Sequence, residues 1–465
     1  MVLFGATGDL SRRKLLPGLL HLYEAELLRD CRIVGTSLDD LDTEQFVKLA
    51  REAIDEFSRP FDESCWDDFS QRLSFVRQSD GPEALAAAVE EAERQLAAET
   101  DSDQPVQRLH YLSVPPKAAL PVVHQLADAG LVERSRIIME KPFGTDLASA
   151  QKLNSRLHEV FAEEQIFRID HFLGKEAAQN ILAFRFANGL FEPIWNRNFI
   201  DHVQIDVPET LGLEMRASFY ESTGAFRDMV VTHLMQVLAF MAMEPPTSLA
   251  PDPISDEKLK VFRSMRPLEP HNVVRGQYAG YRDLDEVADD SDTETFVALK
   301  VEIDNWRWAG VPFFLRTGKR LPITQTEVRV VFRRTPQLLF HASANRPPEP
   351  NQLVVRLDPT TGVRLLVEAQ RGEHVEPEQI NLDMEFGQEG GEGPAPYEVL
   401  LHAAMRGDST RFTRQDGVEE AWRVMQPLLD APPPVHPYEP GTWGPPEADK
   451  VVAGYGRWHE PWSTS

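Results

Sequence analysis

Cysteine and basic residues are scarce in this chain. Its only cysteines, Cys31 and Cys65, lie in no paired or metal-ligand spacing. They cannot build a disulfide framework, so we expect a reducing, cytoplasmic setting and no metal site. Lys and Arg number 48 against 74 Asp and Glu, a formal charge of −26. Because such a surface repels nucleic acid and anionic lipid, we expect the chain to bind neither.

Long hydrophobic runs are also missing. The apolar start, residues 1–4, is followed by Asp9 and then by Arg12-Arg13-Lys14, the reverse of the order in a signal peptide. The most apolar later segment, residues 229–243, has only about 15 residues, whereas a membrane span needs about 20. We therefore expect no export signal and no membrane span, and we predict a buried helix over residues 229–243.

The first third of the sequence alternates between strand-like and helix-like segments. Apolar strands are predicted at residues 2–4, 32–35, 109–114 and 136–139, and helices up to about residue 28 and over 44–57 and 83–98. This alternation is typical of a Rossmann-like, doubly wound parallel sheet. The turn Gly5-Ala6-Thr7-Gly8 joins the first strand to the first helix, where N–H groups and the helix dipole suit a pyrophosphate. A glycine pair at such a turn also occurs for purely steric reasons.

From about residue 200 the apolar residues recur at every second position. Such runs occupy residues 296–304, 327–332, 353–357, 363–369 and 380–386. They predict a large, mostly antiparallel sheet with one solvated face, accompanied by helices. From Pro432 onward we expect an irregular tail. Since single cores stop growing near about 250–300 residues, we predict two domains: a dinucleotide-binding domain, residues 1–167, and a substrate-binding and oligomerisation domain, residues 168–465.

A nine-residue stretch, residues 168–176, carries an unusual density of ionisable side chains. It places Asp170 and His171 next to each other and Lys175 four residues later. A carboxylate bonded to an imidazole is the usual way to orient a general base, and His233 in the apolar helix is the candidate imidazole. A lone histidine in such a helix is more often a core residue, and the sequence does not prove that Asp170 and His233 meet.

Glu140-Lys141-Pro142 follows a predicted strand at the carboxyl edge of the first sheet, where doubly wound folds bind ligands. A lysine at that place can touch both a coenzyme and a substrate. The same tripeptide is also compatible with an ordinary turn at the end of a strand.

Together these segments resemble the glucose-6-phosphate dehydrogenase family over nearly the whole chain. The resemblance rests on five motifs in the family's order: residues 5–10 with 13–15, residues 140–144, residues 168–171 with 173–176, Arg227-Asp228 with His233-Leu234, and residues 316–319. It implies an oxidoreductase that oxidises D-glucose 6-phosphate at C1 to 6-phospho-D-glucono-1,5-lactone. That reaction, with hydride transfer to NADP, is the first step of the oxidative pentose phosphate pathway. A homodimer or homotetramer is implied as well.

The resemblance also implies a role for individual residues. His233 is the base that takes the C1 hydroxyl proton, and Asp170 is its carboxylate partner. The implied substrate-binding residues are Lys141, His171, Lys175, Glu209, Asp228 and Lys319. The implied coenzyme-binding residues are Gly5, Ala6, Thr7, Gly8, Asp9, Leu10, Ser113 and Lys141.

Three positions depart from the family pattern. Phe172 stands where many members have a tyrosine, and Thr324 where many have a second basic residue after Lys319. Leu38 replaces an arginine that clasps the 2′-phosphate of NADP, and two aspartates, Asp39 and Asp40, follow it. An acidic residue at the end of the second strand suits the free 2′-hydroxyl of NAD. The resemblance therefore favours NADP, and Leu38 leaves NAD open.

Two alternatives compete with this reading. One is a dehydrogenase that acts on unphosphorylated sugars, but a neutral sugar needs no phosphate-binding residues such as His171 and Lys175. The other is a non-catalytic relative that keeps the fold, against which the presence of both Asp170 and His233 argues.

Overall fold

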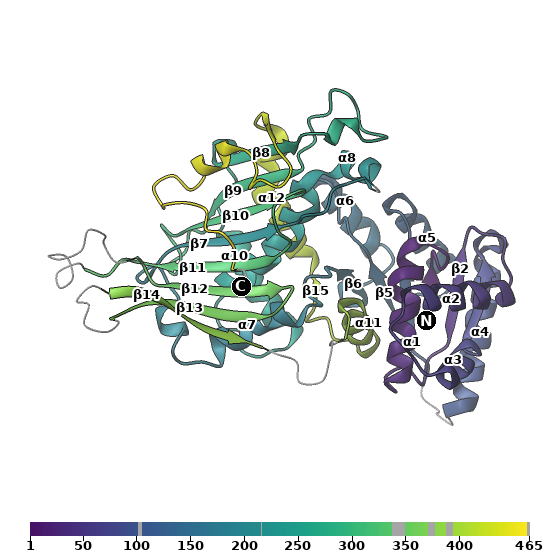
Figure 1. Cartoon of the computed structure of the whole chain (residues 1–465). Helices are drawn as coiled ribbons and strands as arrows, with labels where there is room; N and C mark the ends of the chain where they lie inside the picture. Colours follow the sequence, from purple (N-terminus) through teal and green to yellow (C-terminus); the bar gives the residue numbers. More distant parts are fainter. Residues whose placement is uncertain (101–104, 215, 337–348, 371–376, 387–393, 463–465) are drawn as a thin grey trace.

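Two β-sheets form the framework of the molecule and lie beside each other (Figure 1). The computed structural model describes residues 1–100, 105–214, 216–336, 349–370, 377–386 and 394–462. The first sheet has seven strands and the second nine. No helix in the described part of the chain is long and apolar enough to cross a bilayer.

The first sheet has the strand order β15-β6-β5-β4-β1-β2-β3. All neighbours are parallel except β15, which runs antiparallel to β6. The predicted doubly wound parallel sheet is therefore confirmed. Its strands are β1 (Val2–Phe4), β2 (Ile33–Ser37), β3 (Leu73–Arg77), β4 (Arg108–Leu112), β5 (Ser135–Met139), β6 (Ile166–Ile169) and β15 (Phe412–Thr413).

Helices cover both faces of this sheet. On one face lie α1 (Leu16–Glu24), preceded by the π-helix η1 (Ser11–Leu15), α2 (Thr43–Phe57), α3 (Glu63–Ser70) and α11 (Pro396–Arg406). On the other lie α4 (Gly81–Thr100), α5 (Pro116–Asp128) and α6 (Leu147–His158). The sequence analysis predicts none of α3, α5, α6, β3 and β6.

The first sheet draws on two distant parts of the chain. β6 spans the predicted domain boundary at residue 167, and β15 and α11 return to this sheet from residues 396–413. Leu400 and Leu401 of α11 share one hydrophobic core with Leu16 and Leu19 of α1. Residues 396–413 therefore pack with the dinucleotide-type sheet, although they lie in the second predicted domain.

The second sheet has the order β14-β13-β12-β11-β7-β10-β9-β8-β16. It is mostly antiparallel, as predicted, with parallel pairs at β7–β10 and β8–β16. Its strands are β7 (Ile200–Pro208), β8 (Val273–Tyr278), β9 (Phe296–Glu302), β10 (Pro312–Gly318), β11 (Thr326–Phe332), β12 (Gln352–Asp358), β13 (Gly362–Gln370), β14 (Pro377–Glu385) and β16 (Val435–Tyr438). The sequence analysis did not predict β7, β8 and β10. β8 and β10 are buried on both faces and show no alternation, whereas β7 is buried on both faces although polar and apolar residues alternate over residues 202–207.

Helices pack along the second sheet and link it to the first. They are α7 (Glu176–Phe186), α8 (Ala217–Ala225), the π-helix η5 (Phe226–Leu234), α9 (Met235–Ala242), α10 (Pro251–Ser264) and α12 (Gln415–Asp430). η5 continues directly into α9, and every residue of α9 is buried. The predicted buried helix over residues 229–243 is confirmed.

The C-terminal segment corrects two predictions. It is not irregular throughout, because β16 pairs with β8 and forms one edge of the second sheet. Beyond β16, Trp458 lies 6.1 Å from the ring of Phe314, and Trp462 lies under the guanidinium of Arg356 at 4.1 Å. The tail therefore covers part of the face that the sequence predicts to be solvated, and exposed side chains are left mainly on β14.

Candidate active site

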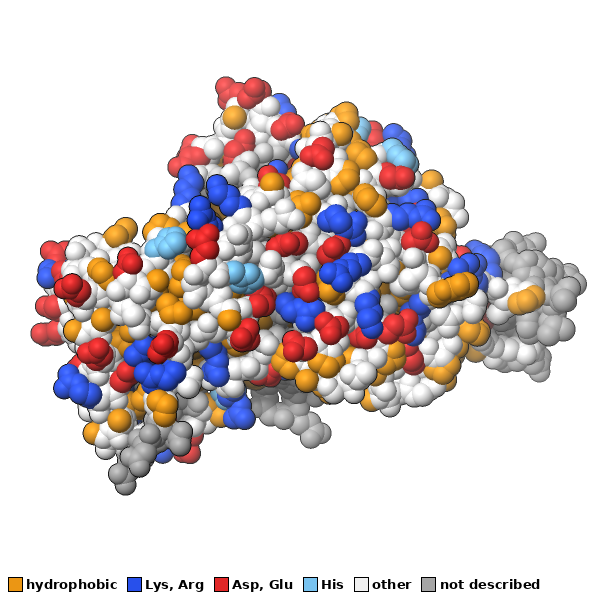
Figure 2. Space-filling model, turned by 180° about the vertical axis from the view of Figure 1, so that it is seen from behind, with side chains coloured by type: hydrophobic (Ala, Val, Ile, Leu, Met, Phe, Trp, Pro, Cys, Tyr) orange, Lys and Arg blue, Asp and Glu red, His pale blue; other side chains and the backbone are white. Residues whose placement is uncertain are grey.

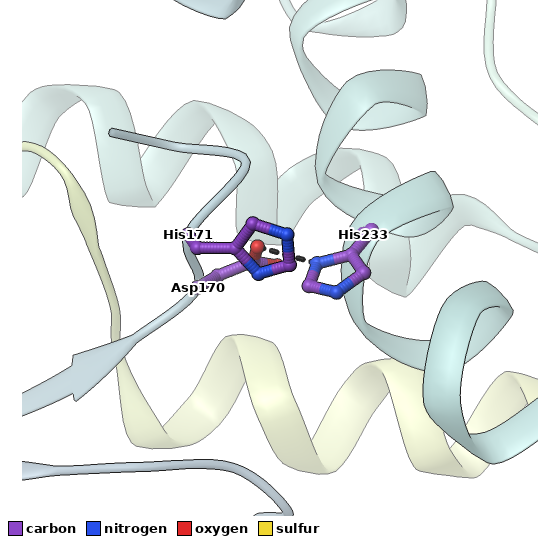
Figure 3. Close-up of side chains that lie close together, drawn as sticks. All are labelled: Asp170, His171 and His233. Carbon is purple, nitrogen blue, oxygen red and sulfur yellow. Dashed lines mark hydrogen bonds and ion pairs between the residues drawn. The ribbon is translucent and has the colours of Figure 1, made fainter. Parts of the chain in front are cut away.

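The loop after β6 and the π-helix η5 bring an acid and an imidazole into contact. Asp170 Oδ1 lies 2.5 Å from Nδ1 of His233, and both side chains are buried (Figure 3). The backbone N–H of Phe172 donates to the same carboxylate oxygen at 2.9 Å. The contact between Asp170 and His233, which the sequence left open, is thus present.

The other ring nitrogen of His233 faces Lys141, at the carboxyl end of β5. Lys141 Nζ lies 2.8 Å from Nε2 of His233 and 2.8 Å from Oδ1 of Asp228. An ammonium group can only donate hydrogen bonds, so Nε2 must present its lone pair. The proton of the neutral imidazole then lies on Nδ1, where it is donated to Asp170. This is the tautomer that a general base requires.

Charge and burial support the same protonation states. Burial lowers the pKa of His233, which keeps the imidazole neutral at neutral pH. Burial by itself raises the pKa of Asp170, but the adjoining His233, with His171 and Lys141, outweighs burial and leaves that pKa below its ordinary value. The pair is therefore a neutral base beside an ionised carboxylate.

Two rings of the nine-residue stretch pack against His233. The Phe172 ring stacks on His233 at 4.3 Å, and the His171 ring meets it edge-on at 4.5 Å. Lys175 Nζ lies 4.6 Å above the Phe172 ring and 3.1 Å from Asp358 Oδ1, at the end of β12. Burial lowers the pKa of His171, so this side chain offers an N–H group rather than a full charge.

The ends of β7 and β10 supply the next group of polar side chains. Lys319 is ion-paired with Glu209, and the Glu209 backbone N–H donates to the carbonyl of Gly318 at 3.0 Å. Burial by itself would raise the pKa of Asp228. The nearby Lys141, and to a smaller extent His233 and Lys319, outweigh burial and lower that pKa below its ordinary value. The structure thus places Glu209 and Lys319 near the Lys141–Asp228 pair.

The glycine turn folds tightly against the end of β4. Gly5 has a φ of +68°, and a Cβ on it would lie 2.0 Å from the carbonyl oxygen of Ser113. The Gly8 N–H donates to the Gly5 carbonyl at 3.0 Å, and the Ser11 hydroxyl donates to the same oxygen at 2.8 Å. Only glycine permits this approach, which places Ser113 beside the predicted dinucleotide turn.

Lys141 lies between two cavities. One, of about 170 Å³, is bordered by Leu112, Val114 and Ser149 at the carboxyl ends of β4 and β5. The other, of about 30 Å³, reaches Asp170 and Gln236. The first cavity and the glycine turn lie on the carboxyl edge of the sheet, where doubly wound folds hold a dinucleotide. The residues present therefore fit such a coenzyme.

The sequence reading missed a buried acid behind Lys141. The Tyr111 hydroxyl, on β4, donates to Glu140, and burial raises the pKa of that carboxyl. Burial and the charge of Glu140 raise the pKa of Tyr397, at the start of α11. Glu140 lay in the predicted Glu-Lys-Pro turn, but nothing in the sequence connected it to Tyr111 or Tyr397.

Other residues of the recognised motifs lie outside this group. Arg316 binds Asp206 at 2.6 Å and is stacked between two tryptophans, Trp443 and Trp458. Thr324 bonds to Thr210 at 2.9 Å, which closes the loop after β7. These contacts hold the second sheet and its loops together.

Two models of one family match almost all of the chain. The model described as "Glucose-6-phosphate dehydrogenase, NAD binding domain" matches residues 2–180. The model described as "Glucose-6-phosphate dehydrogenase, C-terminal domain" matches residues 182–460. The chain belongs to the glucose-6-phosphate dehydrogenase family. The family recognised from the sequence motifs is therefore confirmed.

Full-length relatives agree with this assignment. The chain is 45% identical to glucose-6-phosphate 1-dehydrogenase 1 of Mycobacterium tuberculosis, covering 99% of this chain and 96% of that protein. It is 42% identical to glucose-6-phosphate 1-dehydrogenase of Rhizobium meliloti, covering 99% and 97%.

Solved structures of the glucose-6-phosphate dehydrogenase family share the fold. The crystal structure of the Mycobacterium avium enzyme superimposes with a TM-score of 0.88 at 44% identity, covering 100% of this chain and 99% of that one. A glucose-6-phosphate dehydrogenase in complex with glucose 6-phosphate superimposes with a TM-score of 0.89 at 31% identity, covering 99% and 98%.

Proposed function

We propose that this chain is a glucose-6-phosphate 1-dehydrogenase, which oxidises D-glucose 6-phosphate at C1 to 6-phospho-D-glucono-1,5-lactone. The observation that carries this proposal is the buried Asp170–His233 pair, with the lone pair of His233 Nε2 directed at Lys141. The names of its full-length relatives support the substrate and the reaction. In metabolism this is the first step of the oxidative pentose phosphate pathway.

His233 is the base in this proposal. Nε2 takes the proton of the C1 hydroxyl, so the hydroxyl must first replace the Lys141 ammonium at that nitrogen. The imidazolium that forms is stabilised by Asp170 through the 2.5 Å contact at Nδ1. Asp228 retains Lys141 close by, and a cation there stabilises negative charge that develops on the C1 oxygen.

The remaining polar residues divide between the two ends of the sugar phosphate. His171 and Lys175 bind the phosphate, because an N–H donor and an ammonium together suit a dianion. Lys141, Glu209, Asp228 and Lys319 bind sugar hydroxyls or the adjoining phosphate. Lys175 must release Asp358 to reach the substrate, since the two form an ion pair at 3.1 Å.

The coenzyme is a nicotinamide dinucleotide, which supplies the acceptor for the hydride from C1. Gly5, Ala6, Thr7, Gly8, Asp9 and Leu10 hold it at the turn after β1, with Ser113 and Lys141 towards its nicotinamide end. The tight packing of Gly5 on Ser113 supports this placement. Family resemblance by itself favours NADP, and Leu38 leaves NAD open.

A homodimer or homotetramer is part of the proposal. Leu382 and Met384 of β14, with Phe386 just beyond it, alternate along the strand and are 51%, 46% and 42% exposed. An apolar stripe of this kind on an edge strand is suited to a second copy of the chain. A cytoplasmic location is supported by the free thiols of Cys31 and Cys65.

An absorbance assay of nicotinamide reduction tests the reaction. Glucose 6-phosphate and glucose are each supplied with NADP and with NAD. We expect turnover with the phosphate and little with free glucose, because only the phosphate uses His171 and Lys175. Equal efficiency with both sugars, or turnover with neither, would overturn the proposal.

The base is tested separately with His233→Asn. We expect kcat to fall by about two to four decades, the usual contribution of a general base, while coenzyme binding persists. Coenzyme affinity from fluorescence titration provides the control for folding. Retained turnover would show that another group removes the proton.

A further inference from the structure

The carboxylate of Asp39 is fixed beside the glycine turn. It follows β2 by two residues, and its Oδ2 accepts hydrogen bonds from the hydroxyls of Thr7 and, at 3.1 Å, Ser37. Turn and strand are joined directly, because the Ala6 N–H donates to the Thr36 carbonyl at 3.1 Å. Two hydroxyl groups therefore hold this carboxylate at the carboxyl edge of the first sheet, and the Asp39 backbone N–H donates to the Ser37 hydroxyl oxygen at 3.1 Å.

This position lies where an adenosine ribose would meet the protein. In doubly wound domains the pyrophosphate lies on the turn after β1, and a side chain at the end of β2 meets the 2′-position of the ribose. Both hydrogen bonds to the carboxylate fall on Oδ2, and no described residue donates to Oδ1. Oδ1 therefore remains as an acceptor for a ribose hydroxyl, whereas a 2′-phosphate would bring a second anion against it.

Two arginines near this edge are paired with other acids. Arg77, at the end of the neighbouring strand β3, pairs with Asp40 at 2.7 Å and with Asp80 at 3.2 Å. Arg13 pairs with Asp9 at 2.8 Å. Leu38, 86% exposed, carries no charge to offset that of Asp39. The fixed charge of Asp39, with an uncharged residue before it, thus favours a ribose that bears a hydroxyl.

We propose that Asp39 makes this coenzyme site select NAD over NADP, a proposal that rests on the dehydrogenase function proposed above. The carboxylate accepts a hydrogen bond from the 2′-hydroxyl of NAD and repels the 2′-phosphate of NADP. Thr7 and Ser37 are positioning residues, because their hydroxyls fix the carboxylate next to the turn.

The test compares kcat/KM for NAD and NADP, with saturating glucose 6-phosphate, in the wild type and in Asp39→Asn. A hydrogen bond to a charged group corresponds to about ten- to a hundredfold in affinity. We expect the wild type to prefer NAD by at least about tenfold, and Asp39→Asn to move the ratio towards NADP by a similar factor. Leu38→Arg, which adds a cation, should raise the efficiency with NADP further.

Glu44→Gln is the matched control, because it removes the same charge from an exposed position in the first turn of α2. It should leave the coenzyme ratio unchanged. A wild type that prefers NADP, or an Asp39→Asn ratio within twofold of the wild type, would overturn the proposal. Dissociation constants of both coenzymes, measured without sugar, give the same ratio independently of turnover. Failure of the proposed reaction is therefore distinguishable from failure of this inference.

Discussion

Lys175, a proposed phosphate ligand, is paired with an acid that a phosphate can replace. Its ammonium lies over the Phe172 ring and pairs with Asp358, which is itself only partly buried. An ion pair that is open to water contributes little to stability. A phosphate dianion can therefore replace Asp358 as the partner of Lys175 at small cost.

We expect Lys175→Ala to raise KM for glucose 6-phosphate by about tenfold or more, the usual effect of losing a charged hydrogen bond. The KM of the coenzyme should remain the same, because the glycine turn is untouched. Steady-state kinetics measure both constants. Lys260→Ala is the control, because this lysine is exposed and pairs only with Glu257 on its own helix. An unchanged KM for the sugar phosphate would remove Lys175 from the phosphate site.

Lys258, on α10, is a buried cation of another kind. Only 6% of the residue is exposed, and its ammonium lies 5.0 Å from the ring of Phe240. Burial lowers its pKa to about 8, and the charge of Asp170 opposes that shift. Lysine in an unfolded chain titrates at about 10.5. Between about pH 8 and pH 10.5 the unfolded chain therefore binds more protons than the folded chain. The free energy of unfolding rises with pH across that window.

Lys258→Met should therefore raise the melting temperature at pH 7, where the buried lysine is charged. The gain should shrink between about pH 8 and pH 10.5, as the wild-type lysine becomes neutral in the unfolded chain as well. Thermal unfolding at both ends of this range measures the effect, with Lys260→Met as control. A lower melting temperature at pH 7 would show that attraction to Asp170 outweighs the cost of burial.

At the scale of elements, the proposed base lies on an unusual helix. His233 is part of the π-helix η5, which begins at Phe226, just after Gly224. Gly224 has a φ of +68°, and a Cβ there would lie 2.3 Å from the Glu294 carboxylate, which accepts a hydrogen bond from the Phe226 N–H. π-helical turns often occur at functional sites. Here the wider turn belongs to the segment that presents both Asp228 and His233.

The C-terminal tail has an identifiable structural role, because it covers part of the second sheet. Trp462 is buried and lies 4.1 Å from the guanidinium of Arg356 and 4.3 Å from that of Arg364. Its backbone N–H donates to Glu327 on β11 at 2.5 Å. The tail thereby shields charged side chains on the outer face of the second sheet.

Trp462→Ala should lower the free energy of unfolding by about 3 kcal/mol, the usual cost of truncating a buried tryptophan. Denaturant unfolding followed by circular dichroism measures the change. Trp306→Ala is the matched control, because Trp306 is 95% exposed and its removal should have almost no effect. Equal effects of the two substitutions would mean that the tail does not stabilise the sheet.

At the scale of the whole molecule, acidic and basic side chains are interspersed over the surface (Figure 2). No patch of a single sign dominates the visible face, although the net charge is −26. The proposed association with another copy would use apolar surface, and the stripe formed by Leu382, Met384 and Phe386 is suited to it. Other apolar side chains, such as Leu249, are exposed singly.

We expect Met384→Asp to shift the protein from an oligomer towards the monomer, because a charge in the stripe must be buried without a partner. Light scattering during size-exclusion chromatography measures the mass. Leu249→Asp, at an exposed position outside β14, should leave the mass unchanged. An oligomer that survives the Met384 substitution would place the interface elsewhere.

Patterns that are local in the sequence were read correctly. The apolar runs at residues 353–357 and 363–369 appear as β12 and β13, although β12 is buried along all but its last residue and most of β13 is partly buried. β10 was missed because it is buried on both faces and shows no alternation. β7 was missed although its polar and apolar residues alternate over residues 202–207. The return of β15 to β6 was also beyond local reading, since a two-residue strand leaves no pattern.

The nine-residue stretch, residues 168–176, shows what the sequence and the tertiary structure each determine. The sequence alone determined the family, the glycine turn, and a local density of ionisable groups. Only the tertiary structure decided their tasks: Arg168 is fully buried against Glu163, Asp170 meets His233 63 residues away, and Lys175 meets Asp358. The physical reason is that motifs depend on neighbours along the chain, whereas the charge state and partner of a side chain depend on what folding packs against it.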